Sequence, residues 1–170
     1  MEYWIVYDLA TGADRLRGSG PVGTAGLQAV PEGFGIVLVP PAAAMGPAID
    51  LDVIRSASAT GIDAQAELVR QSILTPGSGQ AMTYQRKEAE ARAWSLDNAS
   101  ATPFLSAEAS ARGMTIADLA AEIIQLADAW VAIGAAIEGL RMGAKAAVGR
   151  AANLGEIVAA SKVDWSVLNG

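Results

Sequence analysis

Two pairs of carboxylates are the residues whose type and spacing best suggest chemistry. Glu88 and Glu90 lie two residues apart, as do Asp50 and Asp52, and two carboxylates can act as the acid and the base of a glycosidase. Residues two apart on a helix point in different directions, whereas on a strand they share one face, here the exposed one. We therefore expect all four to be solvated surface residues.

Two residue types are missing from the chain. It contains no cysteine, which excludes disulfides, thiolate nucleophiles and zinc–thiolate sites. It also contains no histidine, the commonest general base and metal ligand. We expect a protein that is not an enzyme and has no catalytic, cofactor-binding or metal-binding residues. An enzymatic alternative, such as a wall hydrolase, would have to use carboxylates alone.

Two glycine-rich segments are candidates for phosphate loops. Residues 18–23 read GSGPVG and residues 75–80 read TPGSGQ. Neither contains the lysine of a phosphate loop or the G-x-G-x-x-G pattern between a strand and a helix. We interpret both as connecting segments.

Aromatic and basic side chains have two interpretations each. The four tryptophans are Trp4, Trp94, Trp130 and Trp165. Tryptophan rings can form a surface on which sugars stack, but these four are spread along the chain, which favours packing in a core. Three cations near the end of the longest predicted helix complement the helix dipole and need no bound anion; they are Arg141, Lys145 and Arg150.

That helix, predicted over about 115–152, is the element around which the chain is organised. Thr115 is a suitable cap, with Asp118 three residues later. Apolar residues then recur every three or four positions and form a seam, at Ile116, Leu119, Ile123, Leu126, Trp130, Ile133, Ile137, Leu140, Ala144 and Ala147. Small residues flank the seam, which favours a helix within a bundle over a lone two-stranded coil.

The segments before this helix divide into strands and then helices. Alternating apolar residues predict strands at 3–9, 15–20, 35–40 and 48–54, and period 3.6 predicts helices at 59–74, 80–94 and 103–112, with a break at 75–79. Pro103 suits a first helical turn and Gly113 a helix end. The fold class is α+β, with a small antiparallel β domain for docking at 1–58 and a helical bundle at 59–170. Trp165 and Leu168 could dock on a partner.

Charge and hydropathy restrict the partners. The net charge of −6 and a pI near 4.6 disfavour nucleic acid and anionic membranes. Between Asp128 and Glu138 the uncharged run is far shorter than the roughly 20 residues that span a bilayer. The opening residues MEYWIVYD lack the basic start and apolar core of a signal peptide. We expect no nucleic-acid binding and no membrane insertion.

The order of motifs between residues 62 and 150 resembles small proteins of tailed phages and prophages encoded near tail-fibre genes. The stretch GQAMTYQRKEAEARAW is followed by a Pro-Phe-Leu turn, a Gly-Met-Thr helix start and ADAWVAIGAAIEGLR. The opening Tyr-x-x-Tyr-Asp-x-x-Thr-Gly is similar to the short β openings of such proteins. The resemblance rests on Gln80, Met82, Tyr84, Lys87, Glu88, Ala89, Trp94, Pro103, Glu108, Gly113, Thr115, Trp130, Ile137, Glu138 and Arg141.

This resemblance implies a virion structural protein of the tail or tail fibre. Such a protein is made in the host cytoplasm and acts by assembly and docking, and it could also take part in host attachment. Its expected partners are other tail or fibre proteins. Trimers are common among fibre-associated phage proteins, so we expect a homo-oligomer, a trimer first and a dimer second. The alternative is a tail-fibre assembly chaperone that is absent from the finished particle.

Overall fold

The computed structural model describes residues 1–73 and 78–169 and confirms the α+β class. Residues 74–77, which hold most of the predicted break, lie outside the described residues. The elements are β1 (Glu2–Asp8), β2 (Asp14–Gly20), the 3-10 helix η1 (Ala25–Leu27), β3 (Phe34–Val39), α1 (Pro41–Ala44), α2 (Leu51–Ile73), α3 (Ser78–Leu96), α4 (Pro103–Arg112), α5 (Ile116–Arg150), α6 (Leu154–Ser161) and the 3-10 helix η2 (Trp165–Asn169).

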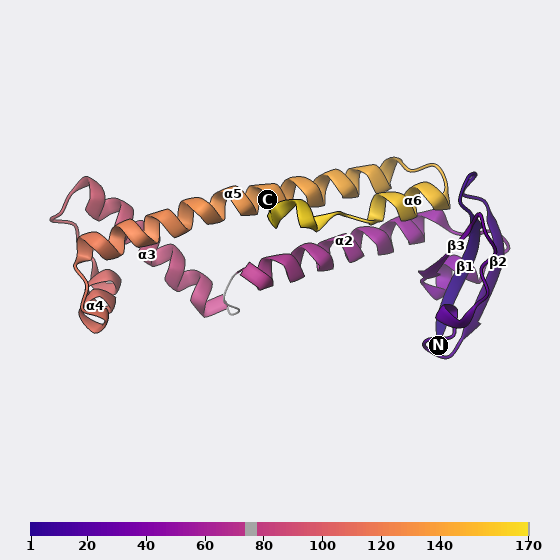
Figure 1. Ribbon diagram of the computed structural model, residues 1–170, viewed down its shortest axis with the longest axis horizontal. Coiled ribbons are helices and arrows are strands. Elements are labelled where there is room, and N and C mark those ends of the chain that lie inside the picture. Colours follow the sequence, from indigo (N-terminus) through magenta and orange to yellow (C-terminus); the bar gives the residue numbers. More distant parts are fainter. Residues whose placement is uncertain (74–77, 170) are drawn as a thin grey trace. The chain divides into compact units, whose positions relative to one another are not determined.

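The first three predicted strands form one antiparallel sheet in the order β2-β1-β3, so β2 and β3 flank β1 (Figure 1). Successive side chains of β1 point to opposite faces. Ile5 and Tyr7 pack with the helices on one face, while Trp4 and Val6 pack with Ala25 of η1 on the other. Both faces are therefore covered around β1.

The fourth predicted strand, at 48–54, is wrong. Leu51 begins α2, and the Asp50 carboxylate accepts the backbone N–H groups of Asp52 and Val53 at 3.0 and 3.1 Å. An aspartate that satisfies the free N–H groups of a first turn favours a helix start. Ile54 is then buried in the same core as Ile62, so the apolar residues follow a helical period.

The predicted helices after this point are present. Thr115 caps α5, accepting the Asp118 N–H at 3.0 Å through its hydroxyl oxygen and donating to the Asp118 carboxylate at 2.7 Å. Gly113 follows α4 with φ of 66°, the left-handed conformation that ends helices. α3 begins at Ser78, slightly before the predicted start at residue 80.

The chain forms two compact units, one of which is discontinuous in sequence. The sheet unit comprises Met1–Leu68 and Glu138–Gly170, and the helical unit comprises Val69–Ile137. This division differs from the predicted domains 1–58 and 59–170, because the first half of α2 and the last turns of α5 pack with the sheet. α5 contributes residues to both units.

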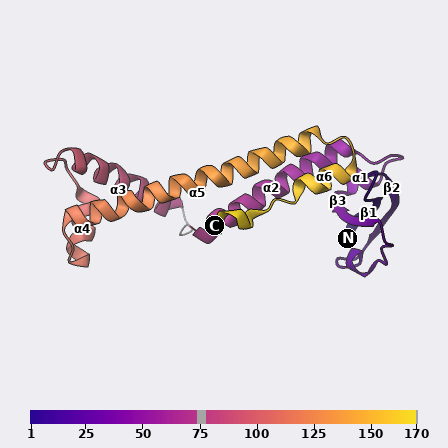
Figure 2. The ribbon, with the colours of Figure 1, turned by 45° about the horizontal axis from the view of Figure 1, so that its top comes forward.

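The core of the sheet unit joins segments from both ends of the chain. Ile5, Ile54, Ile62, Val148 and Ile157 are all buried in it, and α6 lies beside the end of α5 in both Figure 1 and Figure 2.

A close contact holds the β1–β2 turn against α6. A Cβ at Gly12, whose φ is +72°, would lie 2.1 Å from the Asn153 Oδ1 atom, and a Cβ at Gly155 would lie 3.0 Å from the Gly12 Cα. Only glycine, which has no Cβ, leaves room for this close contact at the two positions. Gly155 lies within the first turn of α6.

The helical unit packs α3, α4 and the first half of α5 around a small core. Ala91, Leu105, Ala109, Leu119 and Ala120 are buried there. Trp94, Ile116 and Ile123 pack against them from the edge. The first part of the predicted α5 seam is thus covered within the chain.

Candidate functional site

Three of the four paired carboxylates are local structural groups. Glu88 pairs with Arg92, one helical turn away, at 2.9 Å. Asp50 caps α2, and Asp52 pairs with Arg55 three residues later. Neither aspartate lies on a strand, so the expected shared face does not exist.

Glu90 overturns the prediction of a solvated surface residue. It is 4% exposed, and its Oε2 atom accepts the backbone N–H groups of Phe104 and Leu105 at 2.9 and 3.1 Å. Thr102, at the capping position of α4, makes no capping bond of its own. A carboxylate from α3 therefore supplies the negative charge that the N-terminus of α4 favours. This arrangement positions a helix, and the second oxygen of Glu90 lies 3.4 Å from Arg86 Nε.

Two of the three basic residues that we explained by the helix dipole bind a carboxylate of another helix, and the third, Arg150, is exposed. Lys145 Nζ lies 2.7 and 2.9 Å from the two oxygens of Asp63 on α2, and Arg141 donates to the same carboxylate at 2.5 Å. Hydrogen bonds from Lys145 and then Arg141 hold the pKa of Asp63 below its usual value of 3.8. We call these three residues the α2–α5 clasp; it lies within the sheet unit.

Ion pairs also connect the three helices of the helical unit. Lys87 of α3 binds Glu108 of α4 at 2.7 Å, and Arg112 of α4 binds Glu122 of α5 at 2.9 Å. Hydrogen bonds from Lys87 and then Arg112 lower the pKa of Glu108, against an opposing effect of burial. Since each charge faces an opposite one, this network fixes helix orientation and leaves no aligned acid and base.

The tryptophans do not form a common surface. Trp4 is buried beneath the sheet, and Trp94 packs against the core of the helical unit. The Trp165 indole donates to the Gln65 side chain of α2 at 3.1 Å. Trp165, one of the two tail residues that we expected to be able to dock on a partner, therefore contacts its own chain.

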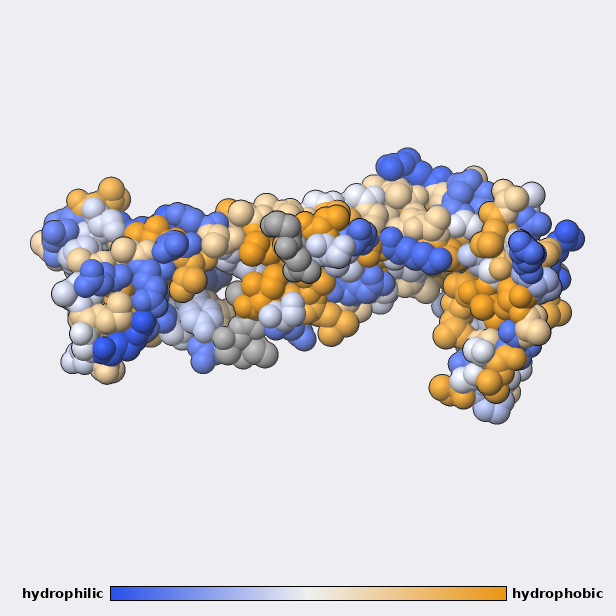
Figure 3. Space-filling view, in the orientation of Figure 1, coloured by the Kyte–Doolittle hydropathy of each residue, from blue (hydrophilic) through white to orange (hydrophobic). Residues whose placement is uncertain are grey.

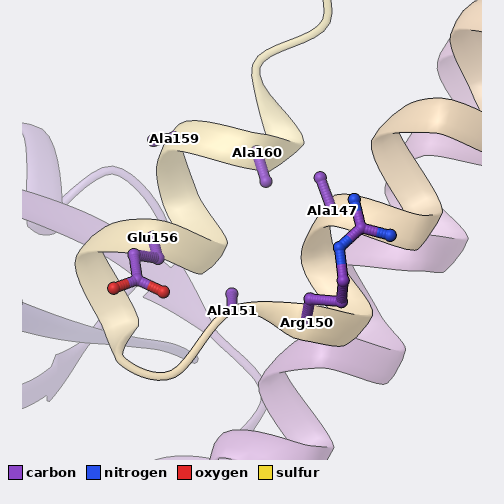
Figure 4. Close-up of a pocket in the computed structure, with 6 residues that line it drawn as sticks. All are labelled: Ala147, Arg150, Ala151, Glu156, Ala159 and Ala160. Atoms are coloured by element: carbon purple, nitrogen blue, oxygen red, sulfur yellow. The ribbon is translucent and has the colours of Figure 1, made fainter.

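Two shallow hollows lie on the surface of the described residues. One, of about 370 Å³, is lined by Ala147, Arg150, Ala151, Glu156, Ala159 and Ala160. Figure 4 shows the Arg150 and Glu156 side chains pointing apart across a floor of alanines.

The other hollow, of about 520 Å³, lies between α3 and α4, where Lys87 and Glu108 bind one another. Among residues 1–73 and 78–169, no group of three or more acidic side chains is placed to hold a metal ion.

The middle of α5 carries part of the exposed apolar surface. Leu126, a seam residue, is 63% exposed and Val131 is also exposed, while Trp130, Ile133 and Leu140 are half-buried. In the described part of the chain, α5 alone is long and apolar enough to cross a membrane by length and composition, a test that core helices also pass, and 11% of its most apolar window is buried.

Further apolar side chains gather over the sheet, on the right of Figure 3. Those exposed in this part of the sequence include Met1, Leu16, Val22, Leu27 and Leu38. Comparison of the sequence and fold with protein-family models, curated proteins and solved structures returns no match.

Proposed function

We propose that this protein is a structural component of a phage tail or tail fibre and acts by assembly. The sheet unit docks on a neighbouring tail or fibre protein, and α5 mediates association between copies of the chain. The phage setting rests on the sequence resemblance of residues 62–150. The assembly role is supported by the apolar middle of α5.

The exposed side chain of one seam residue of α5, Leu126, is the observation that carries this proposal. Leu119 and Ile123 are covered by α3 and α4, but Leu126 is left largely exposed. Since every copy presents the same seam, seams of two or three copies can pack against each other with matching spacing. Leaving such a surface in water favours aggregation, whereas ordered association buries it. We expect a trimer first and a dimer second.

Light scattering on Leu126→Glu and a matched variant tests the association. Leu126→Glu places a charge in the proposed contact and should lower the molecular mass below that of the wild-type protein by removing the association through α5, without loss of helix. Leu68→Glu is the control, because Leu68 on α2 is 66% exposed and lies outside the seam. It should keep the wild-type mass. A wild-type protein that is monomeric at every concentration would exclude self-association and favour the assembly chaperone.

Mass spectrometry of purified phage particles tests the setting. A structural component should be found in the finished particle at a fixed ratio to other tail proteins. Presence in the infected cell together with absence from the particle would support the chaperone. The particle measurement does not depend on the number of chains per oligomer, which light scattering measures.

A further inference from the structure

The two outer edges of the sheet differ in how they are protected. β2 carries Arg15 and Arg17, and its pairing with β1 is irregular between Val6 and Tyr7. Charges and irregularities of this kind discourage an edge strand from pairing with another chain. β3 reads FGIVLV and contains neither a charge nor a proline. β3 is therefore the edge strand whose sequence allows pairing with a strand of another chain.

The backbone of β3 presents a row of free hydrogen-bonding groups on its outer side. Leu9 N–H donates to the Gly33 carbonyl at 2.9 Å, and the register of β1 with β3 continues from this pair. Bonded pairs alternate in an antiparallel ladder, so Gly35, Val37 and Val39 face β1. The N–H and C=O groups of Ile36 and Leu38 therefore point away from the sheet.

Among the described strands, β3 pairs with β1 alone, so its outer edge carries no neighbouring strand. The chain after β3 crosses the sheet to the far side, where the Gly46 carbonyl accepts from Arg17 of β2 at 2.8 Å. The neighbours of η1 are β1 and β2, and α1 and α6 pack on β1. Leu38, at the outer edge, is 59% exposed.

We propose that β3 pairs with β3 of a second copy, antiparallel, about a two-fold axis beside Val37. In this register Ile36 and Leu38 of each copy face Leu38 and Ile36 of the other and exchange four backbone hydrogen bonds. The strand is uncharged, so the second copy meets no like charge. The ladder ends where Phe34, whose N–H already donates to the Pro31 carbonyl, meets Pro40, which has no N–H.

This contact is separate from the proposed association through α5, so the test is carried out in wild-type protein and in the Leu126→Glu background. Leu38→Pro removes an outward N–H and leaves the ladder to β1 intact. Leu38→Lys adds a charge at the edge and serves if the proline variant does not fold. Either change should weaken the β3-dependent dimer at least tenfold in sedimentation analysis. Leu16→Lys is the control, because Leu16 on β2 is 57% exposed.

Cross-linking measures the register directly. The chain has no cysteine, so Val37→Cys introduces a single thiol. Opposite residues in a non-hydrogen-bonded pair approach most closely, and Val37 faces itself across the axis in such a pair. Mild oxidation should link two copies of Val37→Cys and should not link two copies of Leu16→Cys.

Three results would overturn the proposal. The first is a Leu126→Glu protein that is monomeric at all concentrations, and the second is a dimer unaffected by both Leu38 variants. The third is a dimer in which Val37→Cys does not cross-link. Light scattering on Leu126→Glu and Leu68→Glu decides the α5 association independently of these outcomes.

Discussion

Glu90 shows how one side chain can determine the position of a whole helix. α4 is ten residues long, and the side chain of its own capping residue, Thr102, makes no capping bond to the helix backbone. The two N–H groups at its start instead bind the buried Glu90 carboxylate of α3. Because buried N–H groups without partners are costly, the direction in which α4 leaves the loop is tied to this one residue.

Replacing Glu90 by alanine should destabilise the helical unit. The change leaves two N–H groups at the start of α4 without their acceptor, which costs about 1–3 kcal/mol. Glu88→Ala is the matched control, since it removes an exposed partner of Arg92 and should cost less than about 0.5 kcal/mol. Urea unfolding followed by circular dichroism compares the two. Equal effects would show that capping by Glu90 contributes nothing specific.

At the scale of elements, the α2–α5 clasp holds together helices that are far apart in sequence. Asp63 lies 78 residues before Arg141 and 82 before Lys145. Both cations are on the helix face that meets α2, and together they surround one carboxylate. The contact orients the end of α5 that carries Val148 into the core of the sheet unit.

The clasp predicts a contribution to stability that depends on pH. The pKa of Asp63 is lowered in the folded protein, chiefly by Lys145 and then by Arg141. The contribution is therefore present above the usual value of 3.8 and is lost as the pH falls through the lower folded pKa. Asp63→Asn should lower the melting temperature at pH 7 and have little effect near pH 2. In Lys145→Gln, the acid loss should move to a higher pH. The prediction would be contradicted if the melting temperatures of the wild type, Asp63→Asn and Lys145→Gln changed in parallel between pH 2 and 7.

At the scale of the whole molecule, the sheet unit needs both ends of the chain. Its buried residues include Ile5 from the first strand and Val148, Leu154 and Ile157 from the last quarter of the sequence. The helical unit, in contrast, has a core built from residues 91–120. The two units should therefore respond differently to truncation.

A fragment of residues 1–137 should lose the sheet although it contains all three strands. Without Val148, Leu154 and Ile157, the helix-facing side of β1 loses the cover of α5 and α6 and keeps only that of α1 and α2, and a small sheet with a partly uncovered face is marginally stable. Hydrogen exchange should show the amides of β1 unprotected in this fragment. A fragment of residues 69–137 is the control and should keep helical amides protected. Protection of β1 in the truncated chain would contradict the discontinuous core.

The sequence pattern predicted an element correctly where interactions between residues close in sequence determine that element. Alternation in β1 predicted a strand, and Thr115 with Asp118 predicted a helix start, because these signals act over a few residues. Gly113 ended α4 for the same reason. The apolar seam of α5 followed from its period. The absence of histidine and cysteine is likewise a property of the sequence alone.

Tertiary structure decided which residues pack and pair at long range. Residues 48–54 alternate like a strand, but the Asp50 cap and the burial of Ile54 make them the start of a helix. Glu90 is buried because α4 begins beside it. Asp63 on α2 binds two cations on α5, Arg141 and Lys145. The free edge of β3 is defined by the strands it pairs with. These features depend on contacts between distant segments, which local periodicity does not encode.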